Sequence, residues 1–146
     1  MKRYRWVLGC CLLLSIGVLW AEDKSDLRAL QQEAAQNRNL DSYVKVCKLL
    51  YQTEEDPDLL LSYADSIHQL AIESRKPEIF IEYYIWLSEG YFIKGDFEQG
   101  YALKRKAIGL AEKAGLRFTI AQACCDMGYY CNADARYDSA RYYFHK

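Results

Sequence analysis

The hydrophobic and polar positions between Ile79 and Gly115 follow the pattern of two helices joined by a short turn. Between the two runs lies Gly95, which suits the left-handed conformation that often ends a helix, because it has no Cβ. Asp96 is placed to cap the second helix, and Gln99, three residues later, completes a pair resembling a capping box. Apolar or small side chains recur at helical spacing in both runs, at Tyr84, Leu87, Tyr91, Phe97, Gly100, Ala107 and Ala111. The stretch predicts a helical hairpin whose apolar face needs neighbouring hairpins to cover it.

The same pattern recurs at one constant spacing on both sides of this hairpin. Equivalent positions are Cys47, Leu87 and Met127; Tyr51, Tyr91 and Cys131; and Leu60, Gly100 and Ala140. A fixed period of about 40 residues is typical of helical repeat proteins, in which each unit stacks on the next to form a continuous core. It predicts an all-α fold of antiparallel helical hairpins over residues 39–76, 77–116 and 117–146, the last of them incomplete.

These residues resemble the tetratricopeptide repeat. The last unit carries the closest pattern, with Met127-Gly128, Tyr137, Ala140 and Phe144, whereas the middle unit has Ser88 for the family glycine and Lys104 for its phenylalanine. The usual repeat has about 34 residues, so these units look more like the extended repeats of kinesin light chains and of Rap-type bacterial peptide sensors. The resemblance implies a right-handed α-solenoid whose first helices line a concave, peptide-binding groove.

The first 21 residues differ in kind from the rest of the chain. Lys2, Arg3 and Arg5 form a basic start, and an uncharged apolar run follows from Val7 to Leu19. This layout predicts a secretory signal peptide over residues 1–21. An uncleaved membrane anchor over residues 6–21 is the alternative. Either reading places the remaining chain outside the cytoplasm, in the periplasm or cell envelope of a bacterium.

Residues 22–38 precede the repeating pattern. Leu27, Leu30 and Ala34 lie on one face of an amphipathic helix there. Because repeat arrays cover their open ends with a helix of polar outer face, we expect a capping helix that packs on the first hairpin.

The charge of the chain argues against nucleic-acid binding in this segment. The formal net charge is −1, and it becomes −4 once the three basic residues of the signal segment are removed. A nucleic-acid-binding domain would instead display a basic face.

The motifs that usually carry catalysis or metal binding are not found in the sequence. It contains no glycine-rich phosphate loop, no G-x-S-x-G and no H-E-x-x-H motif, and its only histidines are His68 and His145. Cys47, Cys124 and Cys131 fall at repeat positions that face the core, where cysteine acts as a small apolar side chain. We therefore expect a protein without catalytic activity, metal or cofactor.

The resemblance also indicates which side chains would line a groove. By register they are Lys45, Gln52, Glu82, Trp86, Glu89, Gln122, Asp126, Tyr129 and Asn132. Relatives that hold a peptide carboxylate use lysine and asparagine, but only Lys45 matches here, since the equivalent later positions are Ile85 and Cys125. An acidic and aromatic lining instead favours a basic or aromatic peptide. Trp86 has two interpretations, an exposed anchor for such a ligand or a side chain that packs against the next repeat.

The function that follows is protein or peptide binding without catalysis. One alternative is the extracytoplasmic sensor portion of a longer signalling receptor or transcription regulator. A second alternative is a structural subunit that self-associates through its carboxy-terminal end, because Ala140, Tyr143 and Phe144 lie on a helix with no following layer.

Overall fold

The computed structural model describes residues 26–53 and 56–146, and the predicted signal segment at residues 1–21 lies outside them. The described chain is all-helical, without a β-strand. A helix over residues 26–37, here called the N-terminal helix, comes first. It is followed by α2 (Leu40–Thr53), α3 (Pro57–Ser74), α4 (Pro77–Ile93), α5 (Phe97–Ala114), α6 (Arg117–Ala133) and α7 (Tyr137–His145). No helix in the described ranges combines the length and apolar character needed to cross a membrane.

The helix bounds repeat with the spacing that the sequence predicts. Helices α3, α5 and α7 begin at Pro57, Phe97 and Tyr137, which are equally spaced along the chain. Helices α4 and α6 begin at Pro77 and Arg117, and the same interval separates them. Several local signals set these bounds. Proline begins α3 and α4, and Asp96 caps α5. A left-handed residue ends each helix from α3 to α6, at Arg75, Gly95, Gly115 and Ala135.

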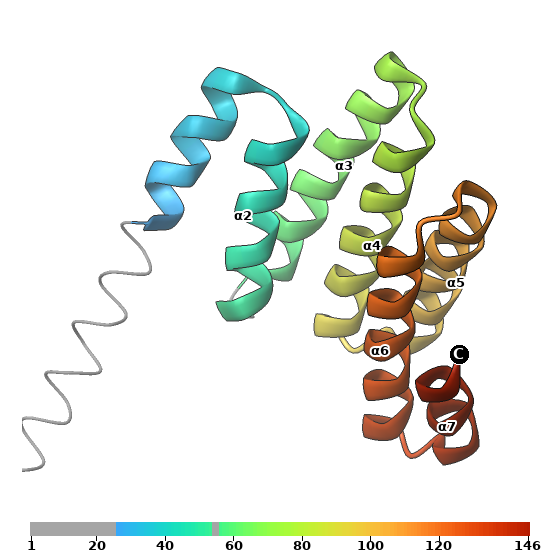
Figure 1. Cartoon of the computed structure of the whole chain (residues 1–146). Helices are drawn as coiled ribbons and strands as arrows, with labels where there is room; N and C mark the ends of the chain where they lie inside the picture. Colours follow the sequence, from blue (N-terminus) through green and yellow to red (C-terminus); the bar gives the residue numbers. More distant parts are fainter. Residues whose placement is uncertain (1–25, 54–55) are drawn as a thin grey trace, which may run out of the picture.

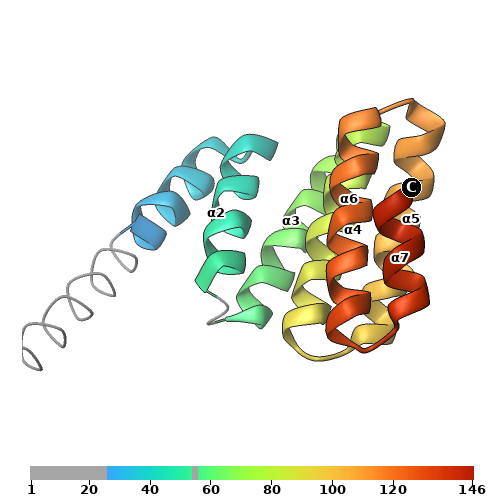
Figure 2. The same ribbon diagram turned by 60° about the horizontal axis from the view of Figure 1, so that its bottom comes forward.

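The helices stack in chain order. Each helix from α2 to α7 packs against the next one, and α2 also contacts α4 across the hairpin between them. Figures 1 and 2 show the antiparallel hairpins following one another, with the N-terminal helix at one end of the stack and α7 at the other. The predicted fold class, stacked antiparallel helical hairpins, is confirmed.

The core runs along the stack as three adjoining groups of buried side chains. The first joins α2, α3, α4 and the N-terminal helix, whose Ala34 is fully buried and whose Leu27 and Leu30 pack beside it. The second joins α5, α6, α7 and Phe92 of α4 around Tyr101 and Met127. The third is smaller and lies between α4 and α5. Cys47, Cys124 and Cys131 are buried and Cys125 is exposed, which confirms the prediction for the three core thiols.

The turns use the left-handed backbone that the sequence predicts for Gly95, whose φ is 81°. Asp96 caps α5 as expected, since its Oδ1 accepts a hydrogen bond of 3.2 Å from the backbone amide of Gln99. The equivalent of Gly95 in the next hairpin is Ala135, with a φ of 56°. A side chain at such a φ is strained, because its Cβ crowds the backbone.

Helix α7 is partly covered by the helices that it packs against. Ala140 is buried, and Tyr143 packs on the core of α5 and α6. Phe144 remains more than half exposed, whereas Ala140 and Tyr143 are covered because α7, although short, lies directly against α6 (Figure 2). Self-association through this end of the chain stays a prediction.

Candidate binding groove

A pocket of about 360 Å³ opens between α2, α4 and α6, the first helices of three successive hairpins. Helix α4 contributes Glu82, Trp86 and Glu89, which share one face because they are spaced by four and three residues. The pocket is lined by residues of all three helices. They are Val44, Lys48, Tyr51 and Gln52 from α2, Glu82, Ile85, Trp86 and Glu89 from α4, and Phe118, Thr119, Gln122, Ala123 and Asp126 from α6. We call this pocket the groove.

Trp86 forms part of the groove wall and belongs to the core as well. It is 8% exposed and packs with the buried residues of the first core group. The ring of Tyr51 meets it edge to face, with 6.5 Å between the ring centroids. Of the two interpretations of Trp86, the expectation of an exposed tryptophan is wrong. The ring packs as the other interpretation expects, but against the preceding hairpin, α2 and α3, and not against the next one. The ring is covered because α2 and α4 lie close enough to contact each other.

Glu82 is the groove carboxylate that is hydrogen-bonded to Trp86. Its Oε2 accepts a 3.0 Å hydrogen bond from the indole Nε1 of Trp86. Burial raises the pKa of Glu82, and this shift is opposed by the Trp86 hydrogen bond and by the charges of Lys48 and Lys104. The carboxyl group of Glu82 is therefore partly desolvated where it lines the groove.

A buried ion pair lies behind the groove. The side chain of Lys104 in α5 is fully buried and pairs with Glu89, whose side chain is 5% exposed. The Lys104 ammonium also lies 3.5 Å from Oδ2 of Asp126. On the other side of Glu89, the hydroxyl of Tyr130 donates a 2.6 Å hydrogen bond to Oε2. A buried charge needs such partners, since an unpaired one is costly in an apolar interior.

This network ties four helices together. Tyr130 of α6 stacks on Phe92 of α4, with 3.8 Å between ring centroids. Its hydroxyl lies 3.4 Å from that of Tyr51 in α2. Burial and the neighbouring negative charge of Glu89 raise the pKa of Tyr130, so its hydroxyl stays a proton donor. The groove floor is consequently a preformed surface, held by α2, α4, α5 and α6.

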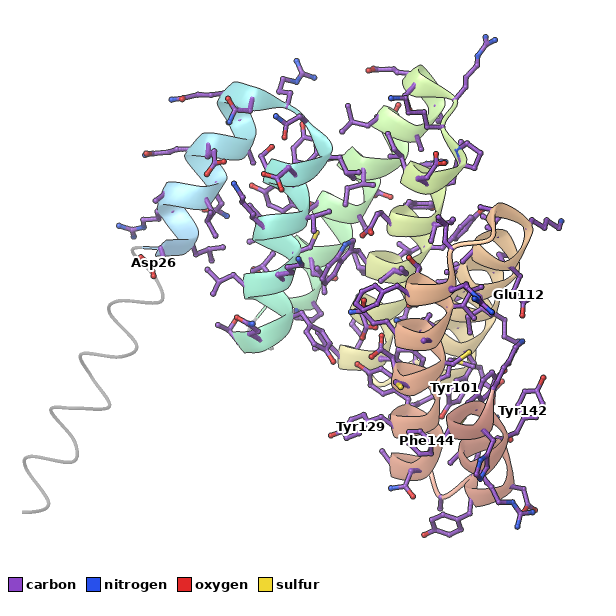
Figure 3. All side chains as sticks on the ribbon, in the orientation of Figure 1. Asp26, Tyr101, Glu112, Tyr129, Tyr142 and Phe144 are labelled. Carbon is purple, nitrogen blue, oxygen red and sulfur yellow. The ribbon has the colours of Figure 1, made fainter. Side chains whose placement is uncertain are left out.

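The residues predicted for the groove divide into two sets. Those that the structure brings together in its lining are Gln52, Glu82, Trp86, Glu89, Gln122 and Asp126, and those outside it are Lys45, Tyr129 and Asn132. Lys45 is held by Asp41 and by Glu33 of the N-terminal helix, at 3.0 Å from each. Tyr129 is 63% exposed and points away from the helix stack in Figure 3. Asn132 lies exposed in the last turn of α6, beyond the groove.

Two important residues were missed by sequence reasoning. Lys104 was seen only as a departure from the repeat pattern, although it lies four residues after Gly100 and three before Ala107, on the buried face of α5. A lysine at a buried position of a helix predicts a buried acidic partner, because an unpaired charge is costly in an apolar interior. Phe118, 81% exposed at the groove, lies four residues before Gln122 and therefore shares its face of α6.

The groove lining offers hydrogen-bonding, charged and apolar side chains. In the part of the chain that the structure describes, no group of three or more histidine, cysteine, aspartate or glutamate side chains is arranged to hold a metal ion. The lining combines amides, carboxylates, one lysine and several apolar side chains. Such a surface can pair with charges, satisfy amides and cover apolar groups.

Comparisons with protein families, with curated proteins and with solved structures found nothing that matches this chain.

Proposed function

We propose that the protein is a non-catalytic scaffold that binds an extended peptide segment in the groove. The observation that carries this proposal is the position of the groove, which is assembled from the first helices of three consecutive hairpins. A ligand that crosses all three would contact α2, α4 and α6 in turn. Extended peptides suit such a surface because their side chains alternate along the chain and their backbone amides need partners.

The side chains present fit that role. Gln52 and Gln122 are exposed on opposite sides of the groove, and each amide can both donate and accept a hydrogen bond. Phe118 and Ile85 supply apolar area in the same groove. The floor is rigid because Tyr51 and Glu89 belong to the buried network, and a preorganised surface loses less entropy on binding.

The proposal includes a tetratricopeptide-like solenoid as the scaffold. The stacked hairpins and the constant interval between equivalent helix starts support it. It also includes export, on the evidence of the basic start and the uncharged run of residues 1–21. Export can be tested by mass spectrometry of the protein from its native envelope. A mature amino terminus near Glu22 is expected, and an intact Met1 would contradict cleavage.

Peptide binding can be tested with an array of blocked nine-residue peptides probed with the full chain. The informative variant is Phe118→Ala, which removes an exposed ring from the groove and leaves the core intact. Tyr129→Ala is the matched control, since it removes an exposed ring from the same helix outside the groove. We expect a subset of peptides to bind, and Phe118→Ala alone to weaken them. The proposal would be refuted if both variants bound the peptides equally well, or if no peptide bound the parent chain.

A further inference from the structure

We propose that the groove selects a peptide carrying a lysine or arginine side chain, and that Glu82 and Asp126 bind its charged end. This inference rests on the proposed function and names its ligand class. The charges of the groove divide into those that are neutralised within the protein and those that are left to face the cavity.

Glu89 is satisfied internally. Lys104 and Tyr130 hold its two oxygens, and its side chain is 5% exposed, so it has little surface to offer a ligand. Lys104 itself is fully buried and presents no positive charge to the cavity surface. The ion pair therefore forms the floor of the groove, and it does not determine whether the ligand is positively or negatively charged.

Glu82 and Asp126 remain as the acidic groups of the walls. Glu82 accepts the Trp86 hydrogen bond through Oε2, and Asp126 approaches Lys104 through Oδ2 at a long 3.5 Å. Each carboxylate has two oxygens and about four acceptor sites, so both keep capacity for a further donor. Lys48 is the only lysine or arginine among the lining residues, and it is exposed on α2. The walls thus carry a net negative charge.

The apolar residues of the groove fit the rest of such a side chain. Phe118, Ile85 and Trp86 line the same cavity as the two carboxylates. Lysine and arginine bury their methylene stems on apolar surface while the head group pairs with an anion. A cation can also gain from the faces of aromatic rings. A cavity of about 360 Å³ is large enough for one side chain and its neighbouring backbone. An acidic ligand would instead meet two carboxylates and a single ammonium group, that of Lys48.

The test uses the full chain and fluorescein-labelled, blocked nine-residue peptides of alanine, glycine and serine that differ only at the central residue. Central lysine, arginine, N-acetyl-lysine, leucine and glutamate are compared by fluorescence anisotropy. N-acetyl-lysine keeps the length of lysine and removes its charge. We expect the lysine and arginine peptides to bind at least about tenfold more tightly than the others, as charge-assisted hydrogen bonds are strong and selective.

Glu82→Gln and Asp126→Asn should each weaken the lysine peptide by about tenfold, because each removes one charge and keeps the shape of the side chain. Asp65→Asn, on the exposed surface of α3, is the control and should change nothing. Asp126→Lys should shift the preference from the lysine peptide to the glutamate peptide. Circular dichroism establishes that each variant is folded, and the reversal experiment gives a gain of binding that a misfolded protein cannot produce.

The outcomes separate the two proposals. Peptides that bind in a Phe118-dependent way with equal affinity for lysine, N-acetyl-lysine and leucine would overturn the cation site and leave the peptide-binding groove intact. Absence of binding by any peptide would overturn both. Spermidine serves as a cation without a peptide backbone. If it binds as tightly as the lysine peptide, a free polyamine accounts for the site and the peptide proposal is refuted.

Discussion

The pairing of Lys104 with Glu89 makes a sharp prediction for stability. Lys104→Met keeps most of the volume of the side chain and removes its charge. Glu89 would then be buried with Tyr130 as its remaining hydrogen-bond donor, because its side chain is only 5% exposed. Removing one partner of a buried ion pair leaves an uncompensated charge in a medium that solvates it poorly.

The expected loss is about 3–5 kcal/mol in the free energy of unfolding. For a chain of this size each kcal/mol moves the melting temperature by about 3–5 °C, so Tm should fall by about 10–25 °C. The double variant Lys104→Met with Glu89→Gln removes both charges, and a glutamine can still accept from Tyr130. Because replacing both partners is far less costly than removing one, it should lie within about 2 kcal/mol of the parent.

The assay is urea denaturation at neutral pH of the parent, the two single variants and the double variant. A double-mutant cycle then isolates the interaction between the two side chains, and we expect a coupling of at least about 2 kcal/mol. Lys94→Met is the matched control, since Lys94 pairs with Asp58 at 2.7 Å while both side chains are substantially exposed. It should cost less than about 1 kcal/mol. Additive single effects, or equal losses for Lys104→Met and Lys94→Met, would refute the reasoning.

Three further predictions concern packing, backbone strain and ionisation. Gly100→Ala should destabilise the protein by about 1–3 kcal/mol in urea denaturation, because its Cβ would lie 2.7 Å from the buried ring of Phe92. Gly128→Ala should cost less, since the ring that it meets is more than half exposed and can turn away; a larger cost there would contradict this reasoning. Ala135→Gly should raise stability by about 0.5–1 kcal/mol by relieving the strain of a φ of 56°, and an unchanged or lower Tm would oppose that account. Glu82→Gln should be more stable than the parent at pH 7, because burial raises the pKa of Glu82 and so the folded state favours its protonated form. That advantage should shrink as the pH falls through the raised pKa and vanish below the ordinary value of 4.5, and a difference independent of pH would count against it.

Much of the architecture could be predicted from local chemistry. Pro57 and Pro77 begin helices because a proline needs no amide partner in the first turn. Gly95 takes the left-handed turn for which it is suited, and Asp96 caps the helix after it. Buried positions such as Leu60 and Ala140 follow from the repeat period, since each hairpin repeats the same contacts with its neighbour. Each of these features depends on residues close together in the sequence or on a strict repeat.

The candidate groove was predictable only in part. Glu82, Trp86 and Glu89 could be assigned to one face of a helix, because helical spacing alone decides that. Periodicity does not say how deeply such a face is buried. One interpretation of the sequence expects Trp86 to be exposed to solvent. In the structure the ring is buried, because α2 and α4 pack against each other. Likewise Tyr129 and Tyr130 are neighbours in sequence, and only Tyr130 reaches Glu89.

The sequence by itself therefore determined the helices, their turns and the order in which they stack, through spacing, capping residues and the repeat. Only the tertiary structure decided which charges meet. Lys104 is 15 residues from Glu89 and 22 from Asp126, and it joins them because α4, α5 and α6 pack with particular rotations about their axes. Those rotations are set by how the side chains of neighbouring helices interlock, which depends on the whole interface and not on any one segment. The same packing leaves Glu82 and Asp126 facing the groove, where the proposed ligand would bind.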